Sequence, residues 1–205
     1  MDQPPDWAEA LARRLSPLDV VWPAPVAPHS AAVLVLLSRA DDPDLVVTLR
    51  SPALAHQPGQ MALPGGGREA ADESPAVTAL RETGEEVGLN RDQIHLLGQL
   101  PRRRMPRIGA DVVPVVGWWS GFPPLGPIDP GEVAAVVRWP VSALVDPGHR
   151  RMARHPGGGT GPAWQIGQYF CWGLTAGIVD AVLRLAGWAR PWDETAIVEV
   201  PAGFR

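Results

Sequence analysis

The chain has 205 residues, of which 45% are hydrophobic and 20% charged, the proportions of an ordinary globular protein. Its net charge of -4 argues against broad affinity for nucleic acid, because a phosphate backbone attracts an excess of basic residues. The longest apolar runs, such as Ala31–Leu37 and Val112–Trp119, are too short to cross a bilayer, and Met1–Trp7 has no signal-peptide pattern. We therefore expect one cytoplasmic domain over residues 1–205 that binds neither nucleic acid nor membrane.

Two features of the composition restrict the chemistry. All 18 basic residues are arginine, so no lysine is present to act as a base or to form a Schiff base. Cys171 is the only cysteine, which excludes an intrachain disulfide and a cysteine metal cluster. Any phosphate group must therefore be bound by arginine, histidine or backbone N–H groups.

The first third of the chain predicts a short helix followed by strands. Residues Trp7–Leu15 form an amphipathic pattern typical of a helix. Two apolar, β-branched runs, Ala31–Leu37 and Leu45–Arg50, are separated by a turn-like Asp-Asp-Pro segment and predict a hairpin. A short strand is expected at Gln60–Leu63, ending at a proline followed by three glycines.

A central helix is predicted for Ser74–Val87. Ser74 is suited to the N-cap, Pro75 to the first helical position, and Gly88 to the residue that ends the helix. The side of this helix that we expect to face the core carries Ala76, Ala79, Leu80 and Thr83.

The remainder of the chain predicts more strands and a last helix. We expect strands at Ile94–Leu100, Val112–Trp119 and Val133–Trp139, loops at Gly121–Gly131 and His155–Ala163, and a helix over about 174–189 with Ile178, Val179, Val182 and Leu185 on one side. This order predicts an α+β fold in which a mixed sheet is sandwiched between helices.

The central helix carries an unusual concentration of negative charge. Glu82, Glu85 and Glu86 are spaced by three and four residues, so a helix places all three on one face. Like charges at this spacing repel one another, and a hard divalent cation offsets the repulsion. Mg²⁺ is typically bound by carboxylate oxygens and shared with substrate phosphates. The pattern therefore indicates a metal-dependent enzyme.

The full spacing resembles the Nudix box. Over residues 67–89 the positions that match are Gly67, Glu73, Arg81-Glu82, Glu85-Glu86 and Gly88-Leu89. One position departs from the family pattern: Thr83 stands where a bulky aliphatic residue is usual, and we expect it to weaken core packing rather than metal binding. The resemblance implies the Nudix α/β/α sandwich and hydrolysis of a nucleoside diphosphate linked to another group, with Mg²⁺ or Mn²⁺ as cofactor.

The resemblance also assigns roles. It implies that Glu82, Glu85 and Glu86 hold the metal, that Arg81 orients the carboxylates, and that a glycine carbonyl is a further ligand. Two registers of the glycine turn are open, because strict spacing pairs Gly67 with Glu73 whereas counting from Pro64-Gly65-Gly66 pairs Gly66 with Asp72. The general base is also open, and Glu86, Glu85 and a carboxylate outside the box, such as Glu132, are the candidates.

Segments on both sides of the box resemble the coenzyme A pyrophosphatase branch of the family. Upstream these are residues 45–51, Leu54 and 59–66, and downstream they are 131–134, 139–141 and 169–176. Leu63 and Gln57 depart from the branch pattern, which has phenylalanine and histidine there. The implied products are 4′-phosphopantetheine and adenosine 3′,5′-bisphosphate.

Arginines are the expected ligands of the 3′-phosphate of such a substrate. Within the upstream segment we select Arg50, together with Ser51 and Gln60, for substrate binding. Other candidate cations are Arg102, Arg103, Arg104 and Arg107, of which we select Arg103 and Arg104, and the later Arg150, Arg151 and Arg154. An ADP-ribose, NADH or nucleotide-sugar pyrophosphatase and a non-catalytic nucleotide sensor remain as alternatives, and a homodimer is compatible with the sequence.

Overall fold

The computed structural model describes residues 3–24, 29–105, 109–121 and 124–202. The helices are α1 Asp6–Ala12, α2 Pro75–Val87, α3 Val141–Leu144 and α4 Gly173–Ala186, with 3-10 turns η1 Arg91–Gln93 and η3 Pro147–His149. The strands are β1 His29–Ser38, β2 Asp44–Arg50, β3 Met61–Ala62, β4 Gly65–Gly67, β5 Ile94–Gln99, β6 Arg103–Met105, β7 Ala110–Trp119, β8 Val133–Pro140, β9 Arg150–Arg154, β10 Thr160–Ile166, β11 Tyr169–Cys171 and β12 Ile197–Glu199.

The larger sheet is mixed and is built around β1. Its strand order is β3-β2-β1-β7-β5, with β4 also paired to β1, β6 to β7 and β8 to β2. The β1–β7 pair is parallel over its full length, and the other pairs are antiparallel. Both strands of the parallel pair are apolar along nearly every position, as expected for strands that are covered on both faces. The fold is therefore the α+β arrangement that the sequence predicts.

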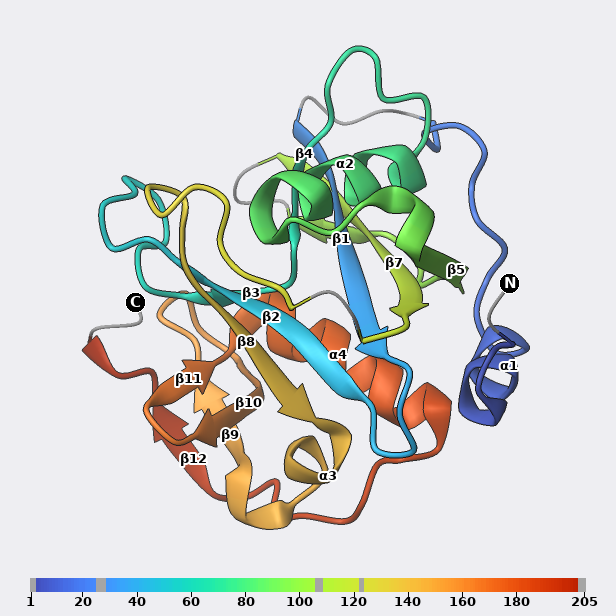
Figure 1. Ribbon diagram of the computed structural model, residues 1–205. Helices are drawn as coiled ribbons and strands as arrows, with labels where there is room; N and C mark the ends of the chain where they lie inside the picture. The colour runs from blue at the N-terminus through green and yellow to red at the C-terminus, as the bar shows by residue number, and fades with distance from the viewer. Residues whose placement is uncertain (1–2, 25–28, 106–108, 122–123, 203–205) are drawn as a thin grey trace.

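Alternation along β1 separates two hydrophobic cores. Ala32, Leu34 and Leu36 pack with Ala79 and Val87 of α2, whereas Val35 and Leu37 lie in the cluster that contains α4. Figure 1 shows the result, with α2 and α4 on opposite sides of β1. Successive side chains of a strand point to opposite faces, so the single strand β1 contributes side chains to the core beneath α2 and to the core beneath α4.

A second sheet, with strand order β11-β10-β9-β12, follows in the last third of the chain. It was not predicted, and it corrects the expected loop at residues 155–163, because Thr160 already begins β10. Trp164 of β10 and Cys171 of β11 belong to the same core cluster as α4 and β1. This shared core supports our proposal that the chain forms a single domain.

The element bounds differ from the predictions mainly at their ends. Helix α1 covers Asp6–Ala12 rather than 7–15, and α4 covers Gly173–Ala186 rather than about 174–189, ending at Gly187 in the left-handed conformation. The glycine turn is itself a strand, β4, since Gly65–Gly67 pair with β1. On α2 the buried residues are Pro75, Thr78, Ala79, Thr83 and Val87, and Leu80 is partly buried and packs against the same core, as expected. Ala76 is only partly buried, and Thr78 is buried in addition to the predicted residues.

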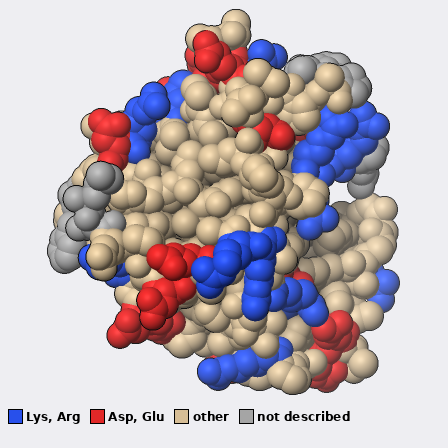
Figure 2. Space-filling model, turned by 90° about the vertical axis from the view of Figure 1, so that its right-hand side faces the viewer, with Lys and Arg blue, Asp and Glu red and all other residues tan. Residues whose placement is uncertain are grey.

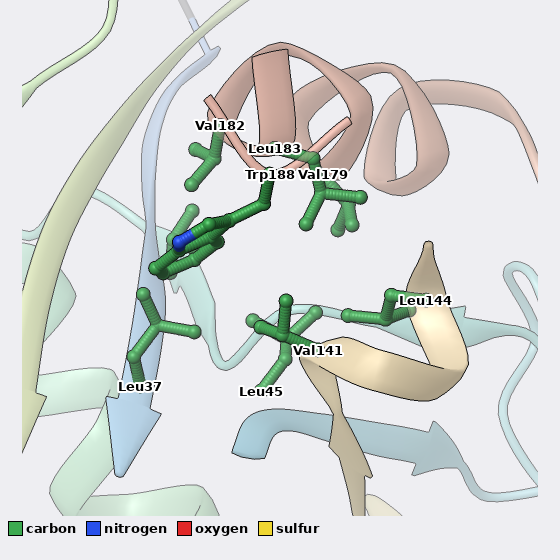
Figure 3. Close-up of a pocket in the computed structure, with 9 residues that line it drawn as sticks. Leu37, Leu45, Val141, Leu144, Val179, Val182, Leu183 and Trp188 are labelled. Atoms are coloured by element: carbon green, nitrogen blue, oxygen red, sulfur yellow. The ribbon is translucent and has the colours of Figure 1, made fainter. Parts of the chain in front are cut away.

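A small apolar recess lies between the sheet and α4 (Figure 3). Its volume is only about 10 Å³, and its lining includes Leu37, Leu45, Val182, Leu183 and Trp188. Its walls belong to the α4 side of the sheet, opposite α2, so we do not assign substrate to it. Figure 2 shows that on the right-hand face of Figure 1 acidic and basic side chains lie next to one another below a broad area of other residues. No helix in the described ranges is long and apolar enough to cross a membrane.

Candidate active site

Helix α2 is fixed at both ends by local interactions. The Ser74 hydroxyl accepts a hydrogen bond from the Val77 N–H at 3.3 Å, and Pro75 occupies the first helical position. Gly88 ends the helix with φ of 75°, a conformation that glycine adopts without strain. Thr83, which we expected to weaken packing, is fully buried and donates its hydroxyl to the Ala79 carbonyl at 2.7 Å, so its polar atom is satisfied.

Arg81 lies at the centre of the acidic cluster. Its guanidinium donates to Asp72 Oδ1 at 3.3 Å and Oδ2 at 3.0 Å, to Glu85 Oε2 at 2.8 Å, to Glu82 Oε1 at 3.0 Å and to the Gly67 carbonyl at 2.8 Å. The hydrogen bond to Asp72, with further help from Glu82, raises the arginine pKa above its ordinary value, against the opposing effect of burial. A single cation thus holds two carboxylates of α2, those of Glu82 and Glu85, and that of Asp72 in the loop before it.

The acidic partner of Arg81 in the preceding loop is Asp72. Its carboxylate is buried and also accepts hydrogen bonds from the Thr78 hydroxyl and the Glu69 N–H, both at 2.9 Å. Burial alone would raise the pKa of Asp72, but the hydrogen bonds from Arg81, Glu69 and Thr78 together lower it. Glu73, the alternative from strict spacing, is exposed to solvent. Arg81 is therefore paired with Asp72 on the acidic side, whereas on the glycine side the carbonyl that faces Arg81 is that of Gly67, so neither of the two registers is met in full.

Strand β4 lies directly against the glutamates. A Cβ atom on Gly66 would stand 2.5 Å from Cδ of Glu82, so a larger residue there would displace the Glu82 carboxylate. The Gly65 N–H donates to Glu86 Oε2 at 3.0 Å. The flanking bonds Leu34 N–H to Pro64 O and Arg68 N–H to Ser30 O place Gly66 at a ladder position that exchanges hydrogen bonds with Ala32, whereas the Gly67 carbonyl faces Arg81.

Burial perturbs two of the three box glutamates. Glu86 has its pKa raised to about 7, chiefly because it is buried, with Glu82 and Glu132 adding to the rise. The Gly65 N–H and Arg50 oppose this rise in pKa. Burial also raises the pKa of Glu82, while Arg81 opposes the change. Glu85 is more open, with 56% of its side chain exposed. A carboxyl group with pKa near 7 in a site of this kind is a functional candidate.

The segments on either side of the box meet next to Glu86. The Ser51 N–H donates to the Glu132 carbonyl at 2.8 Å, and the Arg50 N–H donates to the Gln60 carbonyl at 3.0 Å. Arg50 and Glu132 both act on the charge of Glu86, which places all three in one electrostatic environment. Ser51 is buried, Gln60 is partly buried and Glu132 is exposed. These predicted residues are thus brought together with the box.

The second group of predicted arginines lies elsewhere. Arg103 and Arg104 are on β6, which is separated from β4 by β1 and β7, and both are exposed. Arg104 and Arg102 form ion pairs with the buried Asp111 at 3.4 and 3.3 Å. Arg107 lies outside the described residues.

The later arginines also contribute to structure. Arg150 is buried between the rings of Trp164 and Trp192, with 4.3 and 4.4 Å from its Cζ to the ring centroids, and is ion-paired to Asp180. Arg151 donates to the Gly148 carbonyl and Arg154 to Glu199. None of these contacts joins the site on α2.

The donor set fits a hard divalent cation. Glu82, Glu85 and Glu86 offer carboxylate oxygens, and a bound cation would offset the burial that raises the pKa of Glu82 and Glu86 as well as the repulsion between the two groups. As the side chains stand, Arg81 and the Gly65 N–H occupy these oxygens, and no three acidic, histidine or cysteine side chains in the described residues surround a common point. Metal binding at these residues therefore requires side-chain rotation away from Arg81.

Two contributors were missed at the level of sequence. Thr78 supports Asp72 through its buried hydroxyl, and Ile128 anchors the loop before Glu132 because its N–H donates to the Glu86 carbonyl at 3.3 Å. Thr78 could have been identified from sequence, because a polar residue on the core side of α2 needs a hydrogen-bond partner. Nothing in the local pattern marks Ile128, since its partner is more than forty positions away.

The helix that carries the glutamates lies on one face of a mixed sheet, and a glycine strand and a central arginine contact its carboxylates. This arrangement defines a Nudix-type hydrolase. The comparisons agree, because the family description "NUDIX domain" matches residues 28–156. The chain belongs to the Nudix family. It is 35% identical over 168 residues to the uncharacterized Nudix hydrolase NudL of Klebsiella pneumoniae, covering 80% of this chain and 85% of NudL.

Further relatives extend the comparison. The mitochondrial Nudix hydrolase 15 of Arabidopsis thaliana is 34% identical over 162 residues, covering 74% of this chain and 56% of that protein. A crystal structure of a Nudix hydrolase from Nitrosomonas europaea superposes with a TM-score of 0.53 at 14% identity, covering 84% of this chain and 80% of that one. The chain is accordingly a pyrophosphohydrolase of nucleoside diphosphate derivatives, a class that generally uses divalent metal ions.

Proposed function

We propose that this Nudix hydrolase cleaves the pyrophosphate of coenzyme A or its derivatives, with 4′-phosphopantetheine and adenosine 3′,5′-bisphosphate as products. The observation that carries the proposal is the meeting of the two flanking segments at Glu86. Residues 45–66 supply Arg50 and Gln60, the downstream segment supplies Glu132, and backbone hydrogen bonds join them. The two segments that resemble the coenzyme A branch therefore lie next to the Glu86 carboxylate and not on a remote surface.

Glu82, Glu85 and Glu86 would hold Mg²⁺ or Mn²⁺, together with a glycine carbonyl. Of the two carbonyls considered, that of Gly67 is favoured, because the position of Gly66 in the β1 ladder commits its carbonyl to Ala32. When bound, the metal neutralises phosphate charge and lowers the pKa of a coordinated water. Arg81 and Asp72 act as a positioning pair that fixes the starting orientation of Glu82 and Glu85.

In the reaction a water oxygen attacks one phosphorus and the P–O bond to the bridging oxygen breaks. The bond electrons pass to the leaving phosphate, and the water gives its proton to a base. Glu86 is our first candidate for that base, since its pKa of about 7 matches the ideal for proton transfer near neutral pH. Glu85 and Glu132 are the other candidates for the base. Most of the catalysis in phosphoryl transfer comes from positioning of the reactants and stabilisation of charge.

The deciding experiment is a product assay over a panel of substrates. Purified protein with Mg²⁺ or with Mn²⁺ is incubated with coenzyme A, ADP-ribose, NADH and a nucleotide sugar, and the products are separated by chromatography. Release of adenosine 3′,5′-bisphosphate from coenzyme A is expected, with loss of product in Glu85→Gln and Glu86→Gln. Turnover of ADP-ribose or NADH without turnover of coenzyme A would reject the substrate and retain the reaction.

Binding without turnover defines a separate outcome. Stabilisation by coenzyme A in a thermal shift assay, with no product from any substrate in either metal, would indicate a nucleotide sensor. The presence of all three box glutamates disfavours that outcome, because carboxylates at this spacing suit a divalent cation.

A further inference from the structure

Arg50 ends strand β2 in a position that is fixed from both sides. Its N–H donates to the Gln60 carbonyl at 3.0 Å, and its carbonyl accepts from the Gly59 N–H at 3.2 Å. On the other side it pairs with Val133 across a β-bulge, one residue after Glu132. Five residues beyond Gln60, the Gly65 N–H reaches Glu86. The backbone therefore holds Arg50 between the segment that runs from Gln60 to Gly65 and the segment that contains Glu132.

The guanidinium of Arg50 is not used in the way that Arg81 is. Its Nη2 donates to the His56 carbonyl at 3.2 Å, but its buried Nε has no hydrogen-bond acceptor among the described residues. Within the same ranges no carboxylate lies within 4.0 Å of it, whereas Arg81 is ion-paired with Asp72, Glu82 and Glu85. Leaving a buried donor without an acceptor is unfavourable. An arginine with an unsatisfied donor and no carboxylate partner has N–H groups left for a ligand.

The position of Arg50 separates two possible ligands. A guanidinium offers a planar fork of N–H donors that fits phosphate oxygens. Arg50 acts on the charge of Glu86, in common with Glu82 and Glu132, so its charge is felt where the metal and the bridging phosphates would lie. The 3′-phosphate of coenzyme A is at the other end of the ribose, away from the bond that is cut.

We propose that Arg50 is a catalytic residue that donates hydrogen bonds to the scissile pyrophosphate itself, and not the ligand of the 3′-phosphate. It stabilises the negative charge that the leaving phosphate gains when the bridging P–O bond breaks. This inference rests on the proposed pyrophosphate hydrolysis, but it does not depend on coenzyme A being the substrate. It replaces our expectation from sequence, in which Arg50 binds the 3′-phosphate.

The test compares two substrates that differ only in the 3′-phosphate. Arg50→Ala, Arg50→Lys and wild type are assayed with coenzyme A and with 3′-dephospho-coenzyme A. We expect Arg50→Ala to lower kcat about 100-fold on both substrates, the size of effect seen when one donor to a developing charge is removed. The ratio of kcat/KM between the two substrates should stay within about threefold of wild type, and Arg50→Lys should recover part of kcat.

The controls keep the result interpretable. Arg13→Ala removes the arginine that follows α1, whose side chain is 71% exposed, and should leave both rates unchanged. Unfolding temperatures within about two degrees of wild type would show that Arg50→Ala is folded. As a readout independent of turnover, binding of α,β-methylene-ADP with Ca²⁺ should weaken about tenfold in Arg50→Ala, because the analogue contains the diphosphate but no 3′-phosphate.

Each alternative gives a different pattern. A loss confined to coenzyme A, with normal hydrolysis of the dephospho form, would assign Arg50 to the 3′-phosphate and overturn this inference while leaving the proposed function intact. Unchanged kcat and unchanged analogue binding would also overturn it. If wild type cleaves ADP-ribose but not coenzyme A, ADP-ribose replaces both substrates and the same loss is expected. Failure of wild type to cleave any of these substrates would reject both proposals.

Discussion

Burial of Glu86 predicts a loss of stability as the pH rises in metal-free protein. Its pKa is about 7 in the folded chain against an ordinary value of 4.5. Below pH 4.5 the carboxyl group is protonated in both states and has no effect. Between pH 4.5 and 7 the unfolded state ionises and the folded state does not, so the free energy of unfolding falls. A pKa difference of about 2.5 corresponds to about 3 kcal/mol, which is complete above pH 7.

Glu86→Gln isolates this contribution. The glutamine keeps the shape of the side chain and an oxygen that accepts from the Gly65 N–H, but it does not ionise. Chemical denaturation is measured from pH 4.5 to 8 in EDTA for wild type, Glu86→Gln and the exposed control Glu73→Gln. The variant should gain stability over wild type by about 3 kcal/mol across this range, while Glu73→Gln should follow wild type.

Metal provides a second arm to the same experiment. A divalent cation favours the ionised carboxylate, so saturating Mg²⁺ should remove most of the pH-dependent difference between wild type and Glu86→Gln. A difference that stays flat with pH in EDTA, or that falls as the pH rises, would refute the claim that burial dominates the environment of Glu86.

Other predictions follow from the site. Asp72→Ala should destabilise the protein by about 3 kcal/mol in denaturant unfolding, because it leaves Arg81 without its buried partner. Glu73→Ala should change stability by less than about 0.5 kcal/mol. Equal effects of the two variants would contradict the pairing of Arg81 with Asp72. Gly66→Ala should raise the Mg²⁺ concentration needed for half-maximal activity about tenfold or more, since its Cβ meets the Glu82 carboxylate, while Gly67→Ala enters open space and should have little effect. Chelation by EDTA should abolish hydrolysis, and Mg²⁺ or Mn²⁺ should restore it, as a direct product assay would show.

The parts of the molecule that sequence predicted well are those governed by local rules. Helix α2 begins at Pro75 after Ser74 and ends at Gly88, because capping and left-handed glycine depend on adjacent residues. The apolar runs of β1 and β7 identify strands covered on both faces. The face shared by Glu82, Glu85 and Glu86 follows from helical periodicity.

The parts that sequence left open depend on contacts between distant segments. Spacing cannot choose between Asp72 and Glu73, since the choice depends on which carboxylate is buried against Arg81 and Thr78. Arg103 and Arg104 were selected from sequence beside Arg50, yet both lie on β6, and Arg104 together with Arg102 is ion-paired to the buried Asp111. The second sheet was missed because its strands are short and β12 pairs with β9 from more than forty residues away.

Arg81 gives the cluster a counter-ion that is part of the chain. A cation that enters from solution competes with this guanidinium for Glu82 and Glu85, so the free energy of metal binding is reduced by the ion pairs that must be given up. A substrate that brings its own phosphate oxygens to the metal makes up part of that loss. The resident arginine therefore makes metal occupancy sensitive to substrate, and it allows the carboxylates to remain close together on the helix between turnovers.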